Sequence, residues 1–346
     1  MWDGGERTAA NVKVAETKAW RRGVAHLLAN PSPEEALELS EKAAREVFHV
    51  QGLRPLQKRL LPAILSPPHD EHGRDILAVA GTGAGKSLLY LIPALLSPRG
   101  GVTVVVAPLV ALIKDQMRHA NAVGIATTAL FGRPPAALRR QLLATVAAAK
   151  ASVFFITPEQ ATSADVLLAL HMLYESGKLE RIAVDEAHCI SEWGHDFRPK
   201  LRRLELLRRD FPNTHFLCCT ATATKETQED IISCMRLSNP LLYSSAVGSR
   251  SISYRVLDKS DTSADELAAL VARRWRGRSG LVYCLTKAEA EEVASALRAH
   301  GISAAHHHSD LGEAARYGRC CTRRIPHSLS FYTRCTRLYL PMSLLL

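Results

Sequence analysis

The sequence lacks the features that mark secreted and membrane proteins. None of its eight cysteines forms a CxxC pair, so neither a zinc finger nor a secreted disulfide framework is indicated. The apolar run at residues 88–96 contains Pro93 and is too short to cross a bilayer. The N-terminus has no apolar signal segment, and its acidic residues are untypical of a transit peptide. We therefore expect a protein that stays inside the cell and has neither a membrane partner nor zinc.

The composition also excludes a chain that is disordered throughout. The 346 residues are 47% hydrophobic, which supplies a core for two domains of ordinary size. Lys and Arg (44) exceed Asp and Glu (34), and the net charge of +10 suits a polyanionic partner such as a nucleic acid. Half of this excess lies in residues 312–346, which hold six arginines and one acid. The rest of the chain is only mildly basic.

Apolar runs that alternate with helical patterns indicate the fold of the larger, N-terminal part. Ser32, followed by Pro33 and Glu35, predicts the start of a helix, and residues 1–31 are expected to be a loose extension. Continuous Val- and Ile-rich runs are typical of strands buried on both faces. We therefore expect residues 32–240 to form an α/β domain, a parallel sheet with helices on both faces. The runs lie at residues 75–80, 102–107, 152–156, 182–184 and 216–219.

A second and shorter domain is predicted after a polar stretch. Residues 241–265 are rich in serine and contain the breaker Gly248, as expected of a linker. Apolar patterning then resumes and defines a partial domain over residues 266–311. Residues 312–346 form a divergent basic tail without a periodic pattern. The strand, helix and strand expected in the partial domain are residues 280–284, 287–300 and 302–305.

Residues 80–87 read AGTGAGKS between an expected strand and an expected helix, which is the context of a phosphate-binding loop. Its glycines let successive N–H groups point at phosphate oxygens, and the helix adds its positive dipole end. Lys86 would neutralise the β and γ phosphates of ATP, and the Ser87 hydroxyl would bind Mg²⁺. A glycine-rich turn with an incidental Lys-Ser pair is the alternative. The expected nucleotide ligands are Thr82, Gly83, Gly85, Lys86 and Ser87.

A later apolar strand, residues 181–184, ends in the acidic pair Asp185 and Glu186. Asp185 would hold Mg²⁺ through water, and Glu186 would orient and deprotonate the attacking water. His188 completes the motif Asp-Glu-Ala-His and is grouped with the catalytic residues. An acidic pair alone is more often a helix cap or a solvated turn, but the phosphate loop upstream favours the catalytic interpretation.

Residues 185–199 (DEAHCISEWGHDFRP) resemble the second motif and the aromatic-rich loop of RecQ-family DNA helicases. The resemblance implies two RecA-like domains and ATP-dependent 3′-to-5′ unwinding of DNA in recombination and repair, in a nucleus or in a bacterial cytoplasm. It also implies that the loop couples DNA contact to ATP hydrolysis. Aromatic faces can stack on bases and arginine can contact phosphates, although aromatic residues can also simply fill a core. The expected DNA-coupling residues of the loop are Trp193, His195, Phe197 and Arg198.

Two further segments resemble RecQ motifs that bind the nucleotide or link its site to the DNA. Residues 48–57 resemble the adenine-reading motif, in which the Gln57 amide would pair with adenine and Arg54 would assist. Thr220 and Thr222 lie in a segment that resembles motif III, whose hydroxyls relay between the acidic pair and the DNA. Without the family, the threonine segment is equally well a strand end with a helix cap.

Other segments follow the family's order with weaker local signals. Residues 106–116 resemble motif Ia and residues 157–159 resemble motif Ib, both of which face the DNA backbone in the family. Read by themselves, they are ordinary strand-end loops. The Arg-rich stretch at residues 200–209 is interpreted as a solvated helix face.

The resemblance ends at Leu311, and the tail does not provide the motif VI arginine of the family. We expect a C-terminally truncated and incomplete second RecA-like domain that is loosely ordered or needs a partner chain, and a chain that does not unwind DNA by itself. The main alternative function is a nucleotide-dependent single-strand DNA-binding fragment, and a weaker one is an RNA-remodelling DEAH ATPase.

Three consecutive histidines, His306, His307 and His308, raise the question of a metal site. Adjacent residues of a strand point to opposite faces and cannot converge on one ion. A metal site there is therefore not expected.

Overall fold

The computed structural model divides into two compact units, Met1–Gly248 and Ser249–Leu346. Within the described residues, no helix combines the length and the apolar character needed to cross a membrane. The structure describes residues 4–24, 27, 31–65, 75–191, 203–245, 256, 263–275, 278, 280–308, 310–311, 330–335 and 344–345.

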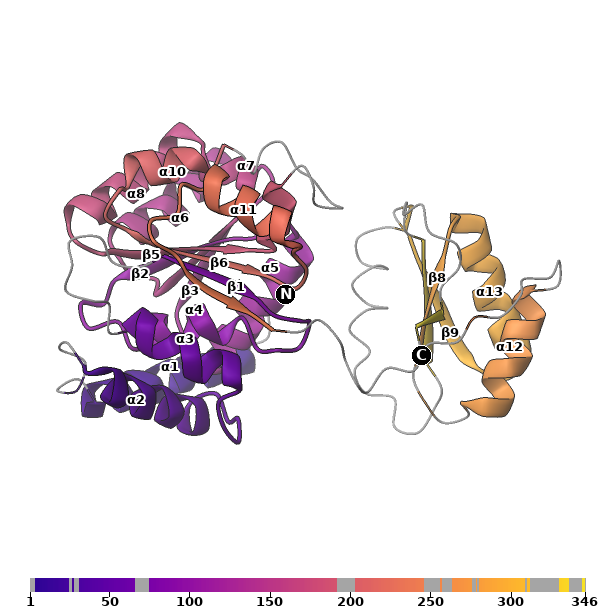
Figure 1. Ribbon diagram of the computed structural model, residues 1–346. Helices are drawn as coiled ribbons and strands as arrows, with labels where there is room; N and C mark the ends of the chain where they lie inside the picture. Colours follow the sequence, from indigo (N-terminus) through magenta and orange to yellow (C-terminus); the bar gives the residue numbers. More distant parts are fainter. Residues whose placement is uncertain are drawn as a thin grey trace. The chain divides into compact units, whose positions relative to one another are not determined.

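The first unit is built on a seven-stranded sheet in which every pairing is parallel, in the order β3-β4-β2-β5-β6-β1-β7 (Figure 1). The predicted parallel sheet is confirmed, and five strands lie where apolar runs predicted them. β3 and β7 were not predicted, because they are only partly buried and no continuous apolar run marks them. The strands are β1 (Ile76–Val79), β2 (Val102–Val106), β3 (Thr127–Leu130), β4 (Val153–Ile156), β5 (Leu179–Asp185), β6 (His215–Thr220) and β7 (Leu241–Ser244).

Helices cover both faces of this sheet, as predicted (Figure 1). Successive side chains of a strand point to opposite faces, so Ala78 of β1 joins one buried cluster and its neighbour Leu77 joins the other. Strands buried in this way require a helical layer on each side. One cluster contains residues of α1 (Gly4–Val24), α2 (Pro33–Glu46), α3 (Pro55–Leu65), α4 (Leu88–Leu95) and α5 (Val110–Ala122), and the other contains residues of α6 (Ala136–Ala147), α7 (Pro158–Ala161), α8 (Ala164–Glu175), α10 (Glu205–Asp210) and α11 (Lys225–Cys234).

The start of α2 has the predicted capping box. The Ser32 hydroxyl accepts a hydrogen bond from the Glu35 N–H (3.2 Å), and the Glu35 carboxylate accepts one from the Ser32 N–H (2.8 Å). Each residue therefore satisfies a backbone donor that the first turn of a helix leaves unpaired.

The N-terminal extension, expected to be loose, contains the helix α1, which packs on the first unit. Thr17 Oγ1 donates a hydrogen bond to the Val123 carbonyl (2.8 Å), and Val24 is 3% exposed. Gly124 has a φ of +79°, and a Cβ atom there would lie 2.4 Å from the Lys13 carbonyl oxygen. Only glycine permits this approach. The sequence does not reveal the helix as an ordered element because its partners lie far along the chain.

Arg208 lies in a buried ion pair and not on the solvated helix face predicted for its segment. Its guanidinium binds the carboxylate of Asp75, which is 1% exposed. The same carboxylate accepts hydrogen bonds from the backbone N–H groups of Phe216 (2.8 Å) and Ser238 (2.6 Å). Asp75 therefore joins the segments that lead into β1, β6 and β7.

The second unit has a four-stranded sheet in the order β11-β8-β10-β9. The predicted strand, helix and strand are confirmed as β8 (Gly280–Cys284), α13 (Lys287–Ala299) and β9 (Ser303–His307), and α12 (Ser263–Arg274) precedes them. The basic tail supplies β10 (Ser330–Cys335), which pairs in parallel with both β8 and β9, and β11 (Leu344–Leu345). These two strands were not predicted, because the tail has no periodic sequence pattern.

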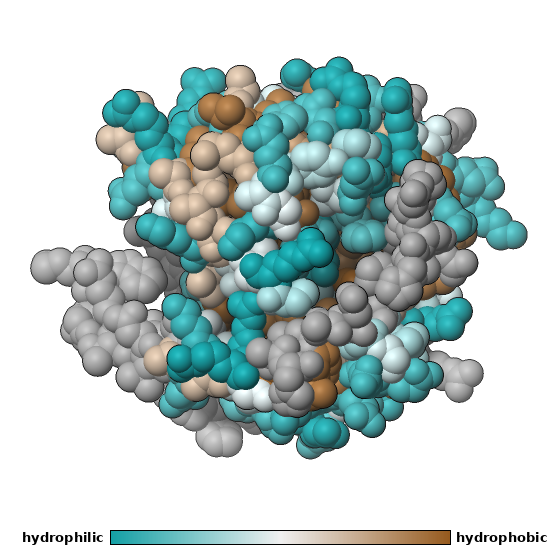
Figure 2. Space-filling view, turned by 90° about the vertical axis from the view of Figure 1, so that its left-hand side faces the viewer, coloured by the Kyte–Doolittle hydropathy of each residue, from teal (hydrophilic) through white to brown (hydrophobic). Residues whose placement is uncertain are grey.

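Hydrophilic residues cover most of the side of the first unit that Figure 2 draws, and apolar residues gather in smaller groups between them. The exposed large apolar side chains of the first unit include Leu138 of α6 and both Leu168 and Met172 of α8.

Candidate nucleotide-binding site

The predicted motifs meet at one edge of the first sheet. β6 lies between β5 and β1, with Asp185 opposite Cys219 and Val79 opposite Thr220. The phosphate loop follows β1, the acidic pair ends β5, and the motif III segment ends β6. In parallel sheets the carboxyl ends of the strands form the edge where ligands bind. The register therefore brings together the residues that the sequence predicted as one site.

The phosphate loop has the backbone that its glycines predict. Gly83 and Gly85 have φ values of +79° and +82°, a region that side chains disfavour. Lys86 follows directly, and its ammonium group donates hydrogen bonds to the carbonyls of Ala80 (2.8 Å) and Gly81 (3.3 Å). Its charge therefore lies over the loop, where phosphate oxygens would compete with these carbonyls.

Ser87 is held by a residue that the sequence did not single out. Gln116 of α5 donates a hydrogen bond from Nε2 to Ser87 Oγ (2.9 Å). This contact joins the motif Ia segment to the phosphate loop. Tyr90, one turn further along α4, is fully buried, and burial followed by the charge of Asp185 raises its pKa well above the ordinary value. The sequence analysis did not single out Tyr90, although its hydroxyl is the one polar side-chain group in the apolar segment that forms α4.

Asp185 is a buried carboxylate at the centre of this edge. Its side chain is 7% exposed. Burial, and then the negative charge of Glu186, raise the pKa of Asp185 to about 6, although the Lys86 ammonium acts in the opposite direction. A carboxylate that the protein itself leaves undercompensated is suited to receive a divalent cation.

Glu186 adopts a left-handed backbone conformation, with φ 54° and ψ 45°. This region is uncommon for residues with a Cβ atom, and such strain is typical of functional sites. Its Oε2 lies 3.3 Å from His188 Nδ1, and the histidine lowers the pKa of Glu186. Contacts with Cys189 and with Glu186 raise the pKa of His188. A charged His188 therefore fits its position beside the carboxylate.

A chain of hydrogen bonds leads from His188 to the motif III segment. His188 Nδ1 lies 2.9 Å from Thr220 Oγ1, which donates to the Thr222 carbonyl (3.0 Å). Since the Thr220 hydroxyl proton is used in that bond, Nδ1 is the donor to Thr220. Thr220 is fully buried and Thr222 is exposed, so the chain runs from the acidic pair to the surface.

The phosphate loop, the acidic pair and the threonines lie within the residues matched by a protein-family model. The model for DEAD/DEAH box helicases matches residues 54–231. The chain belongs to the DEAD/DEAH box helicase family.

Relatives of this helicase chain agree with the resemblance to RecQ helicases. It is 36% identical over 275 residues to the "ATP-dependent DNA helicase hus2/rqh1" of Schizosaccharomyces pombe, covering 78% of this chain and 20% of that protein. It is 34% identical to the "Putative ATP-dependent DNA helicase Q1" of Caenorhabditis elegans, covering 80% and 44%. The chain thus spans less than half the length of these curated relatives.

The fold of the helicase chain is shared with a solved structure of low sequence similarity. The "DUF1998 helicase MrfA bound to DNA and AMPPNP" superimposes with a TM-score of 0.62 at 18% identity, covering 85% of this chain and 43% of the other. At that identity the likeness concerns the fold alone.

The Gln57 side chain makes hydrogen bonds to two backbone groups of this chain. It is 2% exposed, its Oε1 accepts a hydrogen bond from the Arg54 N–H (2.8 Å), and its Nε2 donates to the Gly85 carbonyl (2.9 Å). A Cβ atom on Gly85 would lie 2.3 Å from Nε2. Gln57 therefore braces the phosphate loop. The role of Gln57 and Arg54 in reading adenine stays a prediction.

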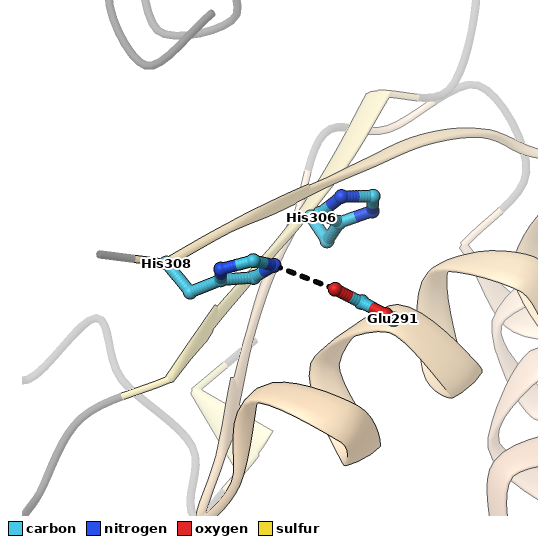
Figure 3. Close-up of side chains that lie close together, drawn as sticks. All are labelled: Glu291, His306 and His308. Atoms are coloured by element: carbon cyan, nitrogen blue, oxygen red, sulfur yellow. Dashed lines mark hydrogen bonds and ion pairs between the residues drawn. The ribbon is translucent and has the colours of Figure 1, made fainter. Parts of the chain in front are cut away.

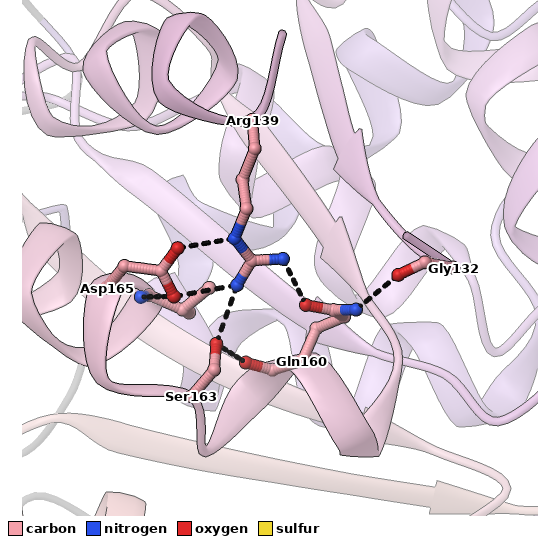
Figure 4. A network of polar contacts seen from close by, with 6 residues as sticks. Gly132, Arg139, Gln160, Ser163 and Asp165 are labelled. Atoms are coloured by element: carbon pink, nitrogen blue, oxygen red, sulfur yellow. Dashed lines mark hydrogen bonds and ion pairs between the residues drawn. The ribbon is translucent and has the colours of Figure 1, made fainter. Parts of the chain in front are cut away.

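The motif Ib segment is braced by an arginine that the sequence did not reveal. Arg139 of α6 binds the Asp165 carboxylate and donates hydrogen bonds to Gln160 Oε1 (2.6 Å) and Ser163 Oγ (2.9 Å) (Figure 4). Gln160 in turn donates to the Gly132 carbonyl (2.6 Å). Arg139, above all, lowers the pKa of Asp165 to about 2. The network fixes the turn that follows residues 157–159.

Several predicted residues remain without a described role. Thr82 is exposed in the phosphate loop, and the structure gives it no contact that distinguishes its function. The DNA-coupling residues lie outside the described residues, so their roles stay predictions. They are Trp193, His195, Phe197 and Arg198.

Proposed function

We propose that the first unit is an ATP-hydrolysing motor domain of a RecQ-type DNA helicase, which takes part in DNA recombination and repair in a nucleus. The observation that carries the proposal is the connected edge formed by the phosphate loop, the acidic pair and the threonine segment. Hydrogen bonds through Thr220 join His188, beside the acidic pair, to the exposed Thr222. That is the arrangement a motor needs to link hydrolysis to a bound strand.

The residues present fit Mg-ATP. The Ser87 hydroxyl and the Asp185 carboxylate are oxygen ligands of the kind that Mg²⁺ prefers, and the raised pKa of Asp185 reflects a negative charge that lacks full compensation. When bound, Mg²⁺ would neutralise charge on the β and γ phosphate oxygens. Lys86 would bind the same phosphates, and Glu186 would orient the attacking water.

The helicase would bind single-stranded or forked DNA through the loop at residues 193–199. Its expected contacts combine base stacking with phosphate binding, which suits a single strand. DNA binding would shift Thr222, and the contacts through Thr220 and His188 would transmit this shift to Glu186. DNA and RNA can be distinguished by competition for stimulation of the ATPase, and preference for RNA would favour an RNA-remodelling enzyme.

Replacement of Lys86 by Ala tests the nucleotide site. We expect Mg-ATP binding measured by calorimetry, or steady-state turnover, to fall by at least about 10²-fold, because the cation facing the β and γ phosphates is lost. Lys150→Ala, which removes an exposed lysine after α6, is the matched control and should behave like the wild type. Unchanged binding and turnover in Lys86→Ala would contradict the proposed function.

A second candidate is a nucleotide-dependent DNA-binding chain that does not unwind. The nucleotide site and the hydrogen bonds that lead from it to Thr222 lie within the first unit alone, which favours this candidate. A strand-displacement assay on a forked duplex separates the two, with a longer relative as the positive control. Unwinding at a comparable rate would exclude the second candidate and would mean that the tail or a partner chain completes the second unit.

A further inference from the structure

Three side chains of the second unit converge at the end of β9. His306 lies in β9, His308 follows its last residue, and Glu291 lies on α13. One ligand atom from each residue lies within 4.8 Å of the other two. The two imidazole rings stack, with centroids 5.2 Å apart and planes 9° apart, and Figure 3 draws both rings beside the Glu291 carboxylate.

The alternation of a strand explains why two of the three consecutive histidines meet. Adjacent residues point to opposite faces, which sets His307 apart, but residues two apart share a face. The expectation that the histidine run cannot converge on an ion therefore holds for neighbours and not for His306 with His308. Glu291 supplies the third ligand from the helix that packs on this face of the sheet.

The chemistry of the three ligands matches a particular class of metal ion. Two imidazoles and one carboxylate are a donor set that binds Zn²⁺ with a fourth position left for water. Tetrahedral bonds of about 2.0–2.1 Å would place the ligand atoms roughly 3.3 Å apart. The His308–Glu291 pair, at 2.9 Å between Nε2 and Oε1, is already within that distance. Glu291 is 55% exposed and can adjust its position.

His308 is a buried histidine whose Nε2 atom faces Glu291. It is 6% exposed, and its Nδ1 atom is buried without a hydrogen-bond partner among the described residues. An ion bound at Nε2 would not use Nδ1, which an ordered water could satisfy.

We propose that Glu291, His306 and His308 form a binding site for Zn²⁺, or for another divalent transition metal ion that favours imidazole, and that the ion fastens β9 to α13. Mg²⁺ is not the intended occupant, because it prefers oxygen ligands in octahedral geometry. The site belongs to the second unit and does not depend on the function proposed for the first.

The test is titration of the 346-residue protein with Zn²⁺ and, separately, with Co²⁺, without nucleotide and with excess Mg²⁺ to occupy oxygen sites. The titration is made at slightly alkaline pH, because metal binding competes with protons for the ligand atoms. Glu291→Gln is the principal variant, because this exposed residue can change without disturbing the core. Glu292→Gln, the same change at the next exposed position of α13, is its matched control, and His307→Ala tests the histidine run.

We expect one ion per chain in the wild type, in Glu292→Gln and in His307→Ala. The Co²⁺ complex should have tetrahedral d–d absorption without thiolate charge transfer. Glu291→Gln and His308→Ala should weaken Zn²⁺ affinity at least about tenfold, since even partners outside the ligand set have effects of that size. Circular dichroism would establish that the variants remain folded.

Three results would overturn the proposal. Absence of stoichiometric binding is one, and thiolate charge transfer, which would assign the ion to cysteines, is another. The third is affinity that survives in Glu291→Gln but falls in His307→Ala, because adventitious binding by a run of histidines depends on the run and not on the helix carboxylate.

Discussion

Replacing Asp185 with Asn is expected to stabilise the first unit while abolishing ATP turnover. In the folded protein, burial and the neighbouring Glu186 raise the pKa of Asp185 from 3.8 to about 6. The folded state therefore holds the proton more tightly than the unfolded state does. Unlike the usual surface aspartate, Asp185 makes the protein less stable as pH rises through the range between these two values.

The size of the effect follows from the two pKa values. A difference of about two pKa units corresponds to roughly 3 kcal/mol at 1.36 kcal/mol per unit, and this penalty applies in full above about pH 7. At about pH 5 the unfolded carboxyl is ionised and the folded one is largely protonated, so roughly half of the penalty remains. Asn has nearly the same shape as Asp but no charge. Asp185→Asn should therefore gain up to about 3 kcal/mol near pH 8 and about half as much near pH 5.

Urea-dependent hydrogen exchange of peptides from β1, β5 and β6 measures the free energy of unfolding of the first unit separately from the second. Asp115→Asn, a change at a half-exposed aspartate of α5, is the control and should show little change. The reasoning is refuted if Asp185→Asn destabilises the unit, or if its gain in stability is the same at both pH values. Asp185→Asn should also lose ATP turnover at both pH values if Asp185 helps to hold Mg²⁺.

Three further changes test other parts of the site and fold. Gly85→Ala places a Cβ atom 2.3 Å from the side-chain nitrogen of Gln57 at a φ of +82°. It should therefore cost at least about 1 kcal/mol of stability and weaken ATP binding in calorimetry. Gly52→Ala, whose Cβ would meet open space, should do neither. Thr220→Val removes the acceptor for His188 and should lower DNA stimulation of ATP hydrolysis at least about fivefold while ATP still binds. Thr145→Val, the same change at a half-buried position of α6, should leave stimulation unchanged. Asp75→Asn breaks a buried ion pair and should lower the free energy of urea unfolding by about 3–5 kcal/mol; a loss below about 1 kcal/mol would contradict this account.

The sequence predicts those parts of the molecule whose physics is local. A phosphate loop needs glycines, a lysine and a hydroxyl in immediate succession, and the structure places Gly85, Lys86 and Ser87 in that arrangement. Strands buried on both faces must be continuously apolar, which located five strands of the first sheet. β7 was not predicted, because its residues alternate between half-buried and exposed and none is fully buried.

Features that depend on residues far apart in the chain were not predictable in the same way. Gln116 reaches Ser87 across 29 positions, and Arg208 reaches Asp75 across 133. In both cases the sequence offers a polar residue on a helix, for which a solvated position is the ordinary interpretation. Only the packing of the helix on the sheet decides otherwise. The pairing of His306 with His308 lies between these extremes, because strand alternation predicts it once the strand is known.

The acidic pair illustrates how neighbouring groups of the same kind acquire different properties. Asp185 ends a buried strand, where desolvation raises its pKa, and Glu186 turns through the left-handed region toward His188, which lowers its pKa. A carboxylate held by a charged histidine is a weak base, so Glu186 is better suited to orient water in this conformation than to deprotonate it. The same Nδ1 atom of His188 faces both Glu186 and Thr220, so a movement that separates it from Glu186 and keeps its bond to Thr220 would raise the basicity of Glu186. The hydrogen bond between His188 and Thr220 thus gives a physical route by which events at the exposed Thr222 can control hydrolysis.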